Sequence, residues 1–299
     1  MHADLPETVY HYTDIHGVQG IYESGELWAT SSRYLNDSTE ATLGLHWLTR
    51  RLLETDTANL KAQNAIYRQA LDDGQSVADR PGASEALAEL EERSRKLKPV
   101  LDAAEDVEKY IDCFIASLSE VPDQLSQWRG YARDGYCIGF STEKLCKALD
   151  EQYELRKVIY HDEEAATIDY LNGITAITTN LANSTTVDDE DHRAWALRSA
   201  IRFESAFVKD PRFSEEKELR IVPFGVVSPT HFTAGRYGMT PRHKITIPRD
   251  AITEVWVGPG AHKDLRGRSL VEYFHHCRVQ FDWQAHPKVR QSAVPYRDW

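Results

Sequence analysis

The sequence has few of the residues that would indicate metal or thiol chemistry. It contains four cysteines, Cys113, Cys137, Cys146 and Cys277, and these form neither a CxxC pair nor a His–Cys cluster at zinc-binding spacing. Their neighbours are mainly apolar, which predicts reduced thiols in the core of a cytosolic protein. We therefore expect no metal site.

The sequence also lacks the short motifs that identify the commonest enzyme classes. It has no GxGxxG, no GxxxxGK[ST], no HExxH and no GxSxG. These absences weigh against dinucleotide-fold oxidoreductases, P-loop enzymes, zincins and α/β-hydrolases. No apolar run approaches the length of a membrane span, and no secretory signal pattern is present. These two absences predict a cytoplasmic protein that has no membrane partner.

Positive charge is also scarce, since the formal net charge of the 299 residues is −12. Such a balance argues against a broad phosphate-neutralising surface for duplex nucleic acid. It leaves room for a small basic pocket within an acidic body. Seven Trp, fourteen Tyr and nine Phe are present, and aromatic side chains suit both a core and a stacking pocket.

The first part of the chain predicts a compact strand–helix–strand unit. Residues 8–13 form a β-prone aromatic run. Asp14 is a good N-cap for a helix that ends at Gly25, where a left-handed residue fits. A second strand over residues 26–31 then leads into a polar loop. A polar, aromatic loop in this position is typical of one wall of a pocket.

Helical patterns concentrate in two blocks, at about residues 40–110 and 162–207, and strand patterns are scattered through the rest. This arrangement predicts an α+β fold rather than regular α/β alternation. We expect a single domain over residues 1–299 with the first block as a helical insertion. The many charges of that insertion fit a solvated helix face, and a surface for a protein partner is the alternative.

Further strands are predicted from apolar alternation. They cover residues 111–119, 135–141, 252–258 and 279–283, and the first of these is the clearest. Residues 231–237 carry Gly235 and are predicted as a loop.

The stretch from Phe213 to Phe224 combines a strand pattern with charge. Residues two apart on a strand share a face, so Glu216, Glu218 and Arg220 point one way and Leu219 points into a core. An edge strand with a wet outer face is one explanation. The other is that Glu218 or Glu216 lies in a ligand cleft.

Three polar clusters near predicted strands could carry chemistry. They are His11, Tyr12 and Thr13 with Ser31, Arg33 and Tyr34; Ser126, Trp128, Arg129 and Tyr131; and Glu216, Glu218 and Arg220.

The order of these clusters resembles a widespread bacterial family of uncharacterised proteins that is grouped with the ADP-ribosyltransferase-like fold. The shared pattern is His-Tyr, then Ser-x-Trp-Arg-x-Tyr, then Glu-x-Glu-x-Arg, and the resemblance runs from about Tyr10 to Arg297 without the helical insertions. It implies a split β-sheet with a cleft for NAD, which would be the substrate.

The resemblance also implies roles for particular residues. His11 would hold the adenosine-side ribose, and Glu218 would contact the nicotinamide ribose as the catalytic carboxylate. Glu216 precedes it as in enzymes that modify arginine, where the first Glu orients the acceptor. A strand-one His belongs to a different subgroup, so the acceptor stays open. Tyr34 would stack on the nicotinamide, with Trp128 or Tyr131 as alternatives.

Other residues of the clusters would complete the NAD site. Arg33, Arg129 or Arg220 could pair bidentately with the pyrophosphate. Alternatively, Arg220 pairs with a glutamate and orients it. The remaining polar residues assigned to NAD binding are Tyr12, Thr13, Ser31 and Ser126. Two structural alternatives stay open: the strand histidine holds the fold together, and Trp128 packs in the core.

The favoured function is therefore an NAD-dependent ADP-ribosyltransferase, of the glycosyltransferase class, that acts on a macromolecular acceptor, either protein or nucleic acid. The resemblance also suggests a toxin or phage-defence effector. One alternative is an NAD glycohydrolase, in which water is the acceptor. The other is a non-catalytic module that senses a nucleotide or binds a partner.

Overall fold

The computed structural model describes residues 4–35, 42–110, 112–132, 135–160, 190–225, 227–235 and 238–295. The chain divides into two compact units. The first, which we call the sheet unit, comprises Met1–Glu40, Asp112–Tyr160 and Lys209–Trp299. The second, the helical unit, comprises Ala41–Ile111 and His161–Val208. Both segments predicted as helical blocks fall in the helical unit.

Within the described residues, ten strands of the sheet unit form one open sheet in the order β10-β9-β4-β1-β3-β2-β8-β7, with β6 between β3 and β5. All pairings are antiparallel except that of β10 with β9. The predicted α+β class is confirmed. The strands are β1 (Thr8–Thr13), β2 (Glu26–Ser31), β3 (Phe114–Ser119), β4 (Tyr136–Ser141), β5 (Tyr153–Lys157), β6 (Glu218–Pro223), β7 (His231–Gly235), β8 (Gly238–Thr246), β9 (Ile252–Val257) and β10 (Lys288–Gln291).

The sheet divides at β3. One side of β3 pairs with β6 from Ala116 to Ser119. On the other side its first two residues pair with β2, and only Ser119 pairs with β1. Among the described strands, none pairs with residues 116–118 on that side. β1 and β2 therefore leave β3 at different points, and a space opens between them.

The helices of the sheet unit are α1 (Ile15–Ser24), α4 (Leu125–Tyr131), α5 (Thr142–Leu149) and α8 (Lys263–Phe281). The predicted caps of α1 are confirmed. The side chain of Asp14 accepts a hydrogen bond from Gly17 N at 2.7 Å, and Gly25 closes the helix with φ of 65°. Only glycine adopts this left-handed conformation at little cost. These local signals fix the entry and exit of the helix between β1 and β2.

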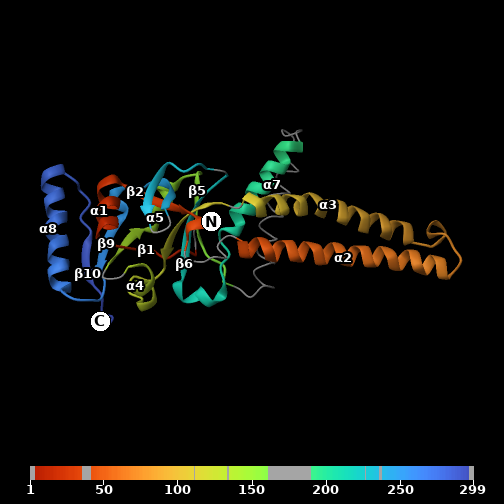
Figure 1. The fold of residues 1–299 in the computed structure, drawn as a ribbon, viewed down its shortest axis with the longest axis horizontal. Coiled ribbons are helices and arrows are strands. Elements are labelled where there is room, and N and C mark those ends of the chain that lie inside the picture. Colours follow the sequence, from red (N-terminus) through yellow and green to blue (C-terminus); the bar gives the residue numbers. More distant parts are fainter. Residues whose placement is uncertain are drawn as a thin grey trace. The chain divides into compact units, whose positions relative to one another are not determined.

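Helices α1, α5 and α8 pack on one side of the sheet and bury its main core. The aromatic rings of Tyr22 on α1 and Phe274 on α8 lie 4.8 Å apart, and the two helices run side by side (Figure 1). Helix α4 packs elsewhere, against β1, where Trp128 meets Tyr12. Since α4 and α1 both contact β1, this strand is held from two directions.

Two predicted elements of the sheet unit are wrong. Residues 279–283 were predicted as a strand, but α8 extends to Phe281 and the last strand is β10. The alternation of Val279 and Phe281 imitates a strand, although both side chains are largely exposed on the helix. The predicted loop at residues 231–237 contains β7, which forms a hairpin with β8.

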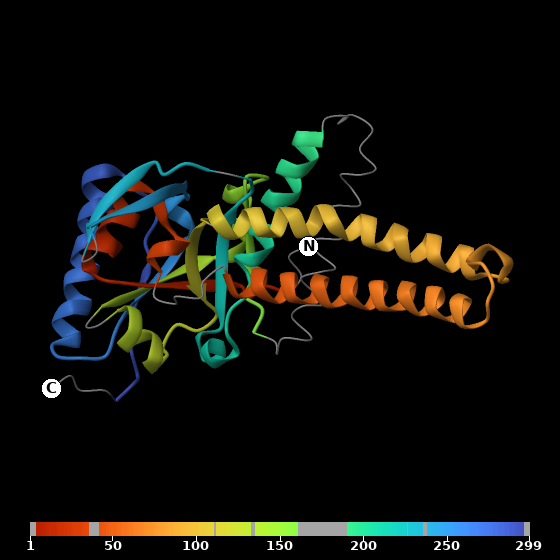
Figure 2. The same ribbon diagram turned by 45° about the vertical axis from the view of Figure 1, so that its right-hand side comes forward.

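The helical unit is built around α2 (Thr42–Asp72) and α3 (Ala83–Tyr110), two long helices that run side by side, joined through a short 3-10 turn at Val77–Asp79 (Figures 1 and 2). Helix α7 (Glu190–Ser205) packs against both. The buried residues include Leu45 and Leu48. Leu53, Leu60 and Tyr67 of α2 are exposed and recur every seven residues. Binding of a protein partner by this insertion stays a prediction. The three exposed side chains are the positions at which substitutions would test such binding.

Three of the four cysteines, Cys113, Cys137 and Cys277, are buried, as predicted, and Cys146 is half-buried. In the described part of the chain, none of the helices combines the length and apolar character needed to cross a membrane.

Candidate functional site

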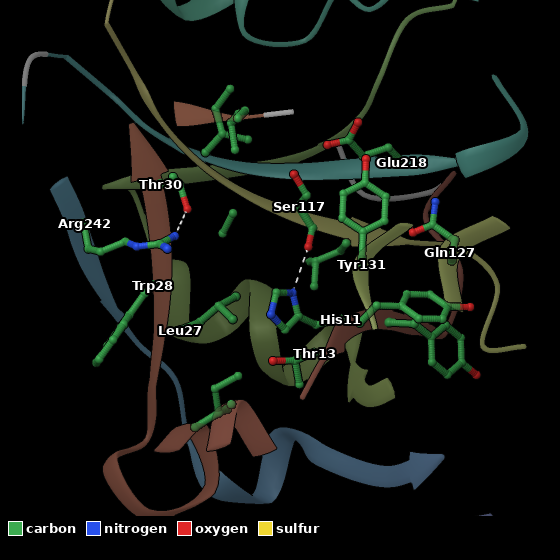
Figure 3. Close-up of a pocket in the computed structure, with 18 of the residues that line it drawn as sticks. His11, Thr13, Leu27, Trp28, Thr30, Ser117, Gln127, Tyr131, Glu218 and Arg242 are labelled. Carbon is green, nitrogen blue, oxygen red and sulfur yellow. Dashed lines mark hydrogen bonds between the residues drawn. The ribbon is translucent and has the colours of Figure 1, made fainter. Parts of the chain in front are cut away.

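A cavity of about 690 Å³ lies at the divide in the sheet, where β1 and β2 leave β3 (Figure 3). It is lined by residues of several elements, and all of the described residues that line it belong to the sheet unit. The wall residues used below are His11, Tyr12 and Thr13 of β1, Trp28 and Thr30 of β2, Tyr34, Ser117 of β3, Gln127 and Tyr131 of α4, Lys209, Glu216, Glu218 and Arg242. The divide in the sheet thus creates the pocket.

His11 occupies the middle of the pocket (Figure 3). Its Nδ1 lies 3.0 Å from the carbonyl oxygen of Ser117, on the part of β3 that has no strand partner on this side. A carbonyl oxygen only accepts, so Nδ1 carries the hydrogen. Burial, together with the charge of Arg242, holds the pKa of His11 below its ordinary value. The neutral ring then leaves Nε2 as a hydrogen-bond acceptor.

Four charged side chains form a cluster at one end of the pocket. The Nζ atom of Lys209 donates to Glu216 Oε2 at 2.6 Å and to Glu218 Oε2 at 2.8 Å. Arg220 donates through Nε to Glu218 Oε1 at 3.0 Å and through Nη2 to Oε2 at 3.1 Å. All four side chains are buried. The cluster holds two carboxylates and two cations, so its formal charge is balanced from within.

A short turn brings these charges together. The 3-10 helix η3 (Pro211–Glu216) starts where the side chain of Asp210 accepts from Arg212 N at 2.9 Å. It ends at Lys217, which has a left-handed φ of 44°. The turn folds the chain back on itself so that Lys209 meets both glutamates. Glu216 therefore lies on the turn and not on the strand where it was predicted.

The protonation of the cluster follows from burial and charge. Burial raises the pKa of Glu218, while Lys209 and a hydrogen bond from Ser117 act in the opposite direction. Burial lowers the pKa of Lys209, but the charges and hydrogen bonds of both glutamates outweigh it and raise that pKa overall. Lys209 is thus a fixed cation, and each oxygen of Glu218 accepts from a cationic donor.

Tyr131 connects the cluster to the open part of the pocket. Its hydroxyl donates to Glu216 Oε1 at 2.9 Å, and its side chain is 42% exposed. Burial of the hydroxyl and the nearby carboxylates raise the pKa of Tyr131, and Lys209 opposes them. The exposed ring can therefore contact a ligand while its hydroxyl stays on Glu216.

The predicted site residues divide between the pocket and its surroundings. Seven line the pocket, namely His11, Tyr12, Thr13, Tyr34, Tyr131, Glu216 and Glu218. Six do not, namely Ser31, Arg33, Ser126, Trp128, Arg129 and Arg220. The three sequence clusters thus meet at one place, although part of each cluster has a structural task.

Several of the six residues outside the pocket have identifiable partners. Trp128 is a core residue, as the packing alternative predicts: its side chain is 2% exposed, and Nε1 donates to Asp123 at 2.7 Å. It therefore offers no face for stacking on nicotinamide. Ser31 donates to Asp112 at 2.6 Å, and Arg33 approaches the same carboxylate at 3.9 Å. Arg220 is fully buried on Glu218 and orients it, as the second of its two predicted roles requires.

Three further residues of the pocket were not predicted from the sequence. Lys209, Trp28 and Arg242 stand outside the polar clusters noted above, yet all three line the pocket. The spacing of Lys209 before an acidic turn was a usable signal, since two buried carboxylates need a cation nearby. No sequence signal marked Arg242, because its position in the pocket depends on the pairing of β8 with β2. Among the described residues, no group of His, Cys, Asp or Glu side chains is arranged to hold a metal ion.

Part of the chain is similar to a protein family. Residues 127–221 match the model of a family described as "Protein of unknown function (DUF2971)". This range contains Tyr131, Lys209, Glu216 and Glu218, whereas His11 lies before it. No curated protein and no solved structure matches the chain. The match covers residues at the acidic end of the pocket, and the description of the family names no activity.

Proposed function

We propose that the sheet unit is an ADP-ribosyltransferase-like domain that binds NAD in this pocket and transfers ADP-ribose to a macromolecular acceptor. The observation that carries the proposal is the single cavity that His11, Tyr131, Glu216 and Glu218 line together at the divide in the sheet. Its volume of about 690 Å³ falls within the range of cofactor sites.

His11 is suited to hold a sugar hydroxyl. Its Nδ1–H is already engaged by Ser117, so Nε2 is the atom left to accept a hydrogen bond from a ribose. The lowered pKa keeps the ring neutral, which preserves this acceptor at neutral pH. We propose that His11 positions the adenosine-side ribose in this way.

Glu218 is suited to stabilise the reacting sugar. In the transfer, the bond between the nicotinamide nitrogen and ribose C1′ breaks, and nicotinamide leaves with the electron pair. Positive charge builds on the sugar as in glycoside cleavage. A fixed carboxylate stabilises this charge more in the transition state than in the substrate. Because Arg220 holds both oxygens of Glu218, the carboxylate would be oriented before NAD binds.

Glu216 and Tyr131 would serve the acceptor. The acceptor forms a new bond to C1′ and releases a proton. Glu216 is the second carboxylate at this end of the pocket, and the exposed ring of Tyr131 lies beside it. We propose that Glu216 orients the acceptor group and that Tyr131 packs against the nicotinamide side of the ligand.

One observation favours a second candidate, a non-catalytic nucleotide-binding module. Lys209 already neutralises Glu216 and Glu218, at 2.6 and 2.8 Å. A carboxylate that is paired in this way stabilises a developing positive charge less well than a free one. On this alternative, the same pocket binds NAD or a related nucleotide without cleaving it.

The deciding experiment incubates the purified chain with NAD that carries a labelled adenylate, with and without a cell lysate. Label transferred to a macromolecule supports the transferase. Label released as ADP-ribose with water as acceptor supports a glycohydrolase in its place. NAD that binds without being consumed supports the binding module.

A matched pair of variants tests the assignment of Glu218. We expect Glu218→Gln to lower NAD consumption by about 10²–10³-fold, the effect of removing one electrostatic contact to a transition state. Glu215→Gln is the control, since Glu215 is exposed on the same turn and does not line the pocket. Thermal melting must show that both variants are folded. Unchanged NAD consumption in a folded Glu218→Gln variant would refute the catalytic role.

A further inference from the structure

Arg242 lies at the opposite end of the pocket from the charged cluster. It stands on β8, opposite Thr30 of β2 and opposite His231 of β7. Its Nη1 donates to the hydroxyl of Thr30, and its Nε donates to the hydroxyl of Thr233 at 3.1 Å. In Figure 3 its guanidinium reaches toward the pocket from the side away from Glu218.

The partners of Arg242 are unusual for a half-buried arginine. Within the described part of the chain, its side chain forms no ion pair with a carboxylate, and both of its hydrogen-bond partners are threonine hydroxyls. Each glutamate that lines the pocket already forms an ion pair with a lysine. Glu26 is paired with Lys244 at 2.9 Å, and Glu216 and Glu218 are paired with Lys209. Arg242 is thus a cation of the pocket without a counter-charge from these three glutamates.

A partly desolvated charge of this kind favours an anionic ligand. Removing a guanidinium from water costs free energy unless an anion compensates it, and burial does lower the pKa of Arg242. An arginine has five N–H donors in a planar fork, and the threonines take two of them. The donors that remain suit the oxygens of a phosphoryl group. The hydroxyl of Thr30 accepts from Arg242 and keeps its own hydrogen for a second contact.

The neighbouring side chain fits the rest of a nucleotide. Trp28 lies on the same strand as Thr30, two residues away and on the same face, and it lines the same pocket. The ring of His231 lies 4.8 Å from the indole, and Lys244 Nζ lies 5.7 Å from its centroid. Trp28 is still 38% exposed, and this exposed part is the surface that a flat ring would contact. Lys244 pairs with Trp28 in the strand register, but Glu26 balances its charge at 2.9 Å, so Arg242 remains the cation that a phosphate would meet here.

We propose that Arg242 and Thr30 form a phosphate-binding subsite for a phosphorylated nucleotide, whose base packs against Trp28. The choice of a nucleotide rests on the proposed function, but the phosphate contact would serve a binding module equally. The two ends of the pocket would then bind different parts of the ligand, with the phosphate at Arg242 and the reacting sugar at Glu218.

The test measures binding of ADP-ribose and of adenosine by calorimetry to the 299-residue chain and its variants. We expect Arg242→Met to weaken ADP-ribose binding by about 10–100-fold, the effect of losing hydrogen bonds to a charged group. Adenosine has no phosphate, so its binding should not change. Arg242→Lys keeps the charge without the fork and should give an intermediate loss. Arg93→Met, an exposed arginine paired with Glu89 in the helical unit, is the control.

The outcomes separate this inference from the proposed reaction. Arg242→Met can lose ADP-ribose binding while the wild type consumes no NAD. That result supports the phosphate subsite and refutes the proposed transferase activity. Unchanged ADP-ribose affinity in both Arg242 variants refutes the subsite, even if NAD is consumed. Equal loss of ADP-ribose and adenosine would also refute it, since the effect would then not depend on phosphate. So would failure of the wild type to bind ADP-ribose.

Discussion

The two ends of the pocket differ in how their buried charges are compensated. At one end, Glu218 meets Lys209 and Arg220 within 3.1 Å, so buried charges satisfy one another. At the other end, Arg242 meets only the hydroxyls of Thr30 and Thr233 among the described residues. Both ends contain a buried or half-buried arginine on a strand of the same sheet. They differ in whether the protein supplies the counter-charge.

This difference separates a structural task from a binding task. A buried ion pair that has all of its partners contributes to the native fold, and loss of one partner leaves a charge stranded in a low dielectric. A half-buried cation that has only hydroxyl partners can be removed at little cost to the fold, and its loss is felt when an anion binds. The acidic end should therefore respond to mutation mainly through stability and chemistry, and the Arg242 end mainly through affinity.

The largest expected effect compares the same substitution at the two ends. Arg220→Met strands part of the charge of Glu218, and we expect it to lower the free energy of unfolding by about 3 kcal/mol. Arg242→Met removes hydrogen bonds to two hydroxyls, and we expect a loss of about 1 kcal/mol or less. Urea unfolding followed by circular dichroism measures both values.

A double variant shows whether charge causes the larger loss. Glu218→Leu combined with Arg220→Met removes both partners, so the loss should be smaller than the sum of the single losses. Equal costs for Arg220→Met and Arg242→Met would mean that the two ends do not differ as described.

The elements around the pocket could be predicted where local signals determine them. The helix between Asp14 and Gly25 follows from its two caps, and both caps are found in the structure. The grouping of Glu216, Glu218 and Arg220 also followed from alternation and was nearly right. The departure arises because Lys217 has a left-handed backbone, which moves Glu216 off the strand. A left-handed backbone is uncommon for lysine, and no residue pattern in the sequence predicts it at this position.

The Arg242 end could not be predicted because it is made by strand register. Arg242 and Thr30 are 212 positions apart in the chain, and the pairing of β8 with β2 brings them together. A shift of one residue would turn Arg242 to the other face of the sheet. Arg242, His243 and Lys244 form a short basic run, but this run matches none of the glycine-rich motifs that mark a phosphate site.

The second effect concerns Lys209, whose charge the acidic end requires. In Lys209→Met the carboxylates lose their shared cation, and the pKa of Glu218, already raised by burial, should rise further. A glutamate whose native pKa exceeds its unfolded value destabilises the fold as pH rises through the native pKa. We therefore expect a loss of about 2 kcal/mol at pH 7 that becomes smaller near pH 4.5.

Urea unfolding at several pH values measures this dependence. Lys217→Met is the control, since Lys217 is exposed on the neighbouring turn. A loss for Lys209→Met that is equal at both pH values would show that packing, rather than charge, is the contribution of Lys209.

The smallest effect comes from His11, whose pKa responds to the charge of Arg242. Burial and that charge lower the native pKa of His11. A histidine with a lowered native pKa contributes its stability fully above the unfolded value of about 6.5 and loses it as pH falls. We expect the stability advantage of wild type over His11→Gln to shrink with acidification by at most about 1.4 kcal/mol per pH unit.

Arg242→Met should raise the pKa of His11 and so weaken this pH dependence, because it removes a nearby positive charge. A titration of the His11 ring by NMR gives the pKa directly, and Arg93→Met serves again as the distant control. An unchanged pKa in Arg242→Met would mean that the charge at this end of the pocket does not reach His11. In that case the charges at the two ends of the pocket would not affect His11, and its low pKa would come from burial alone.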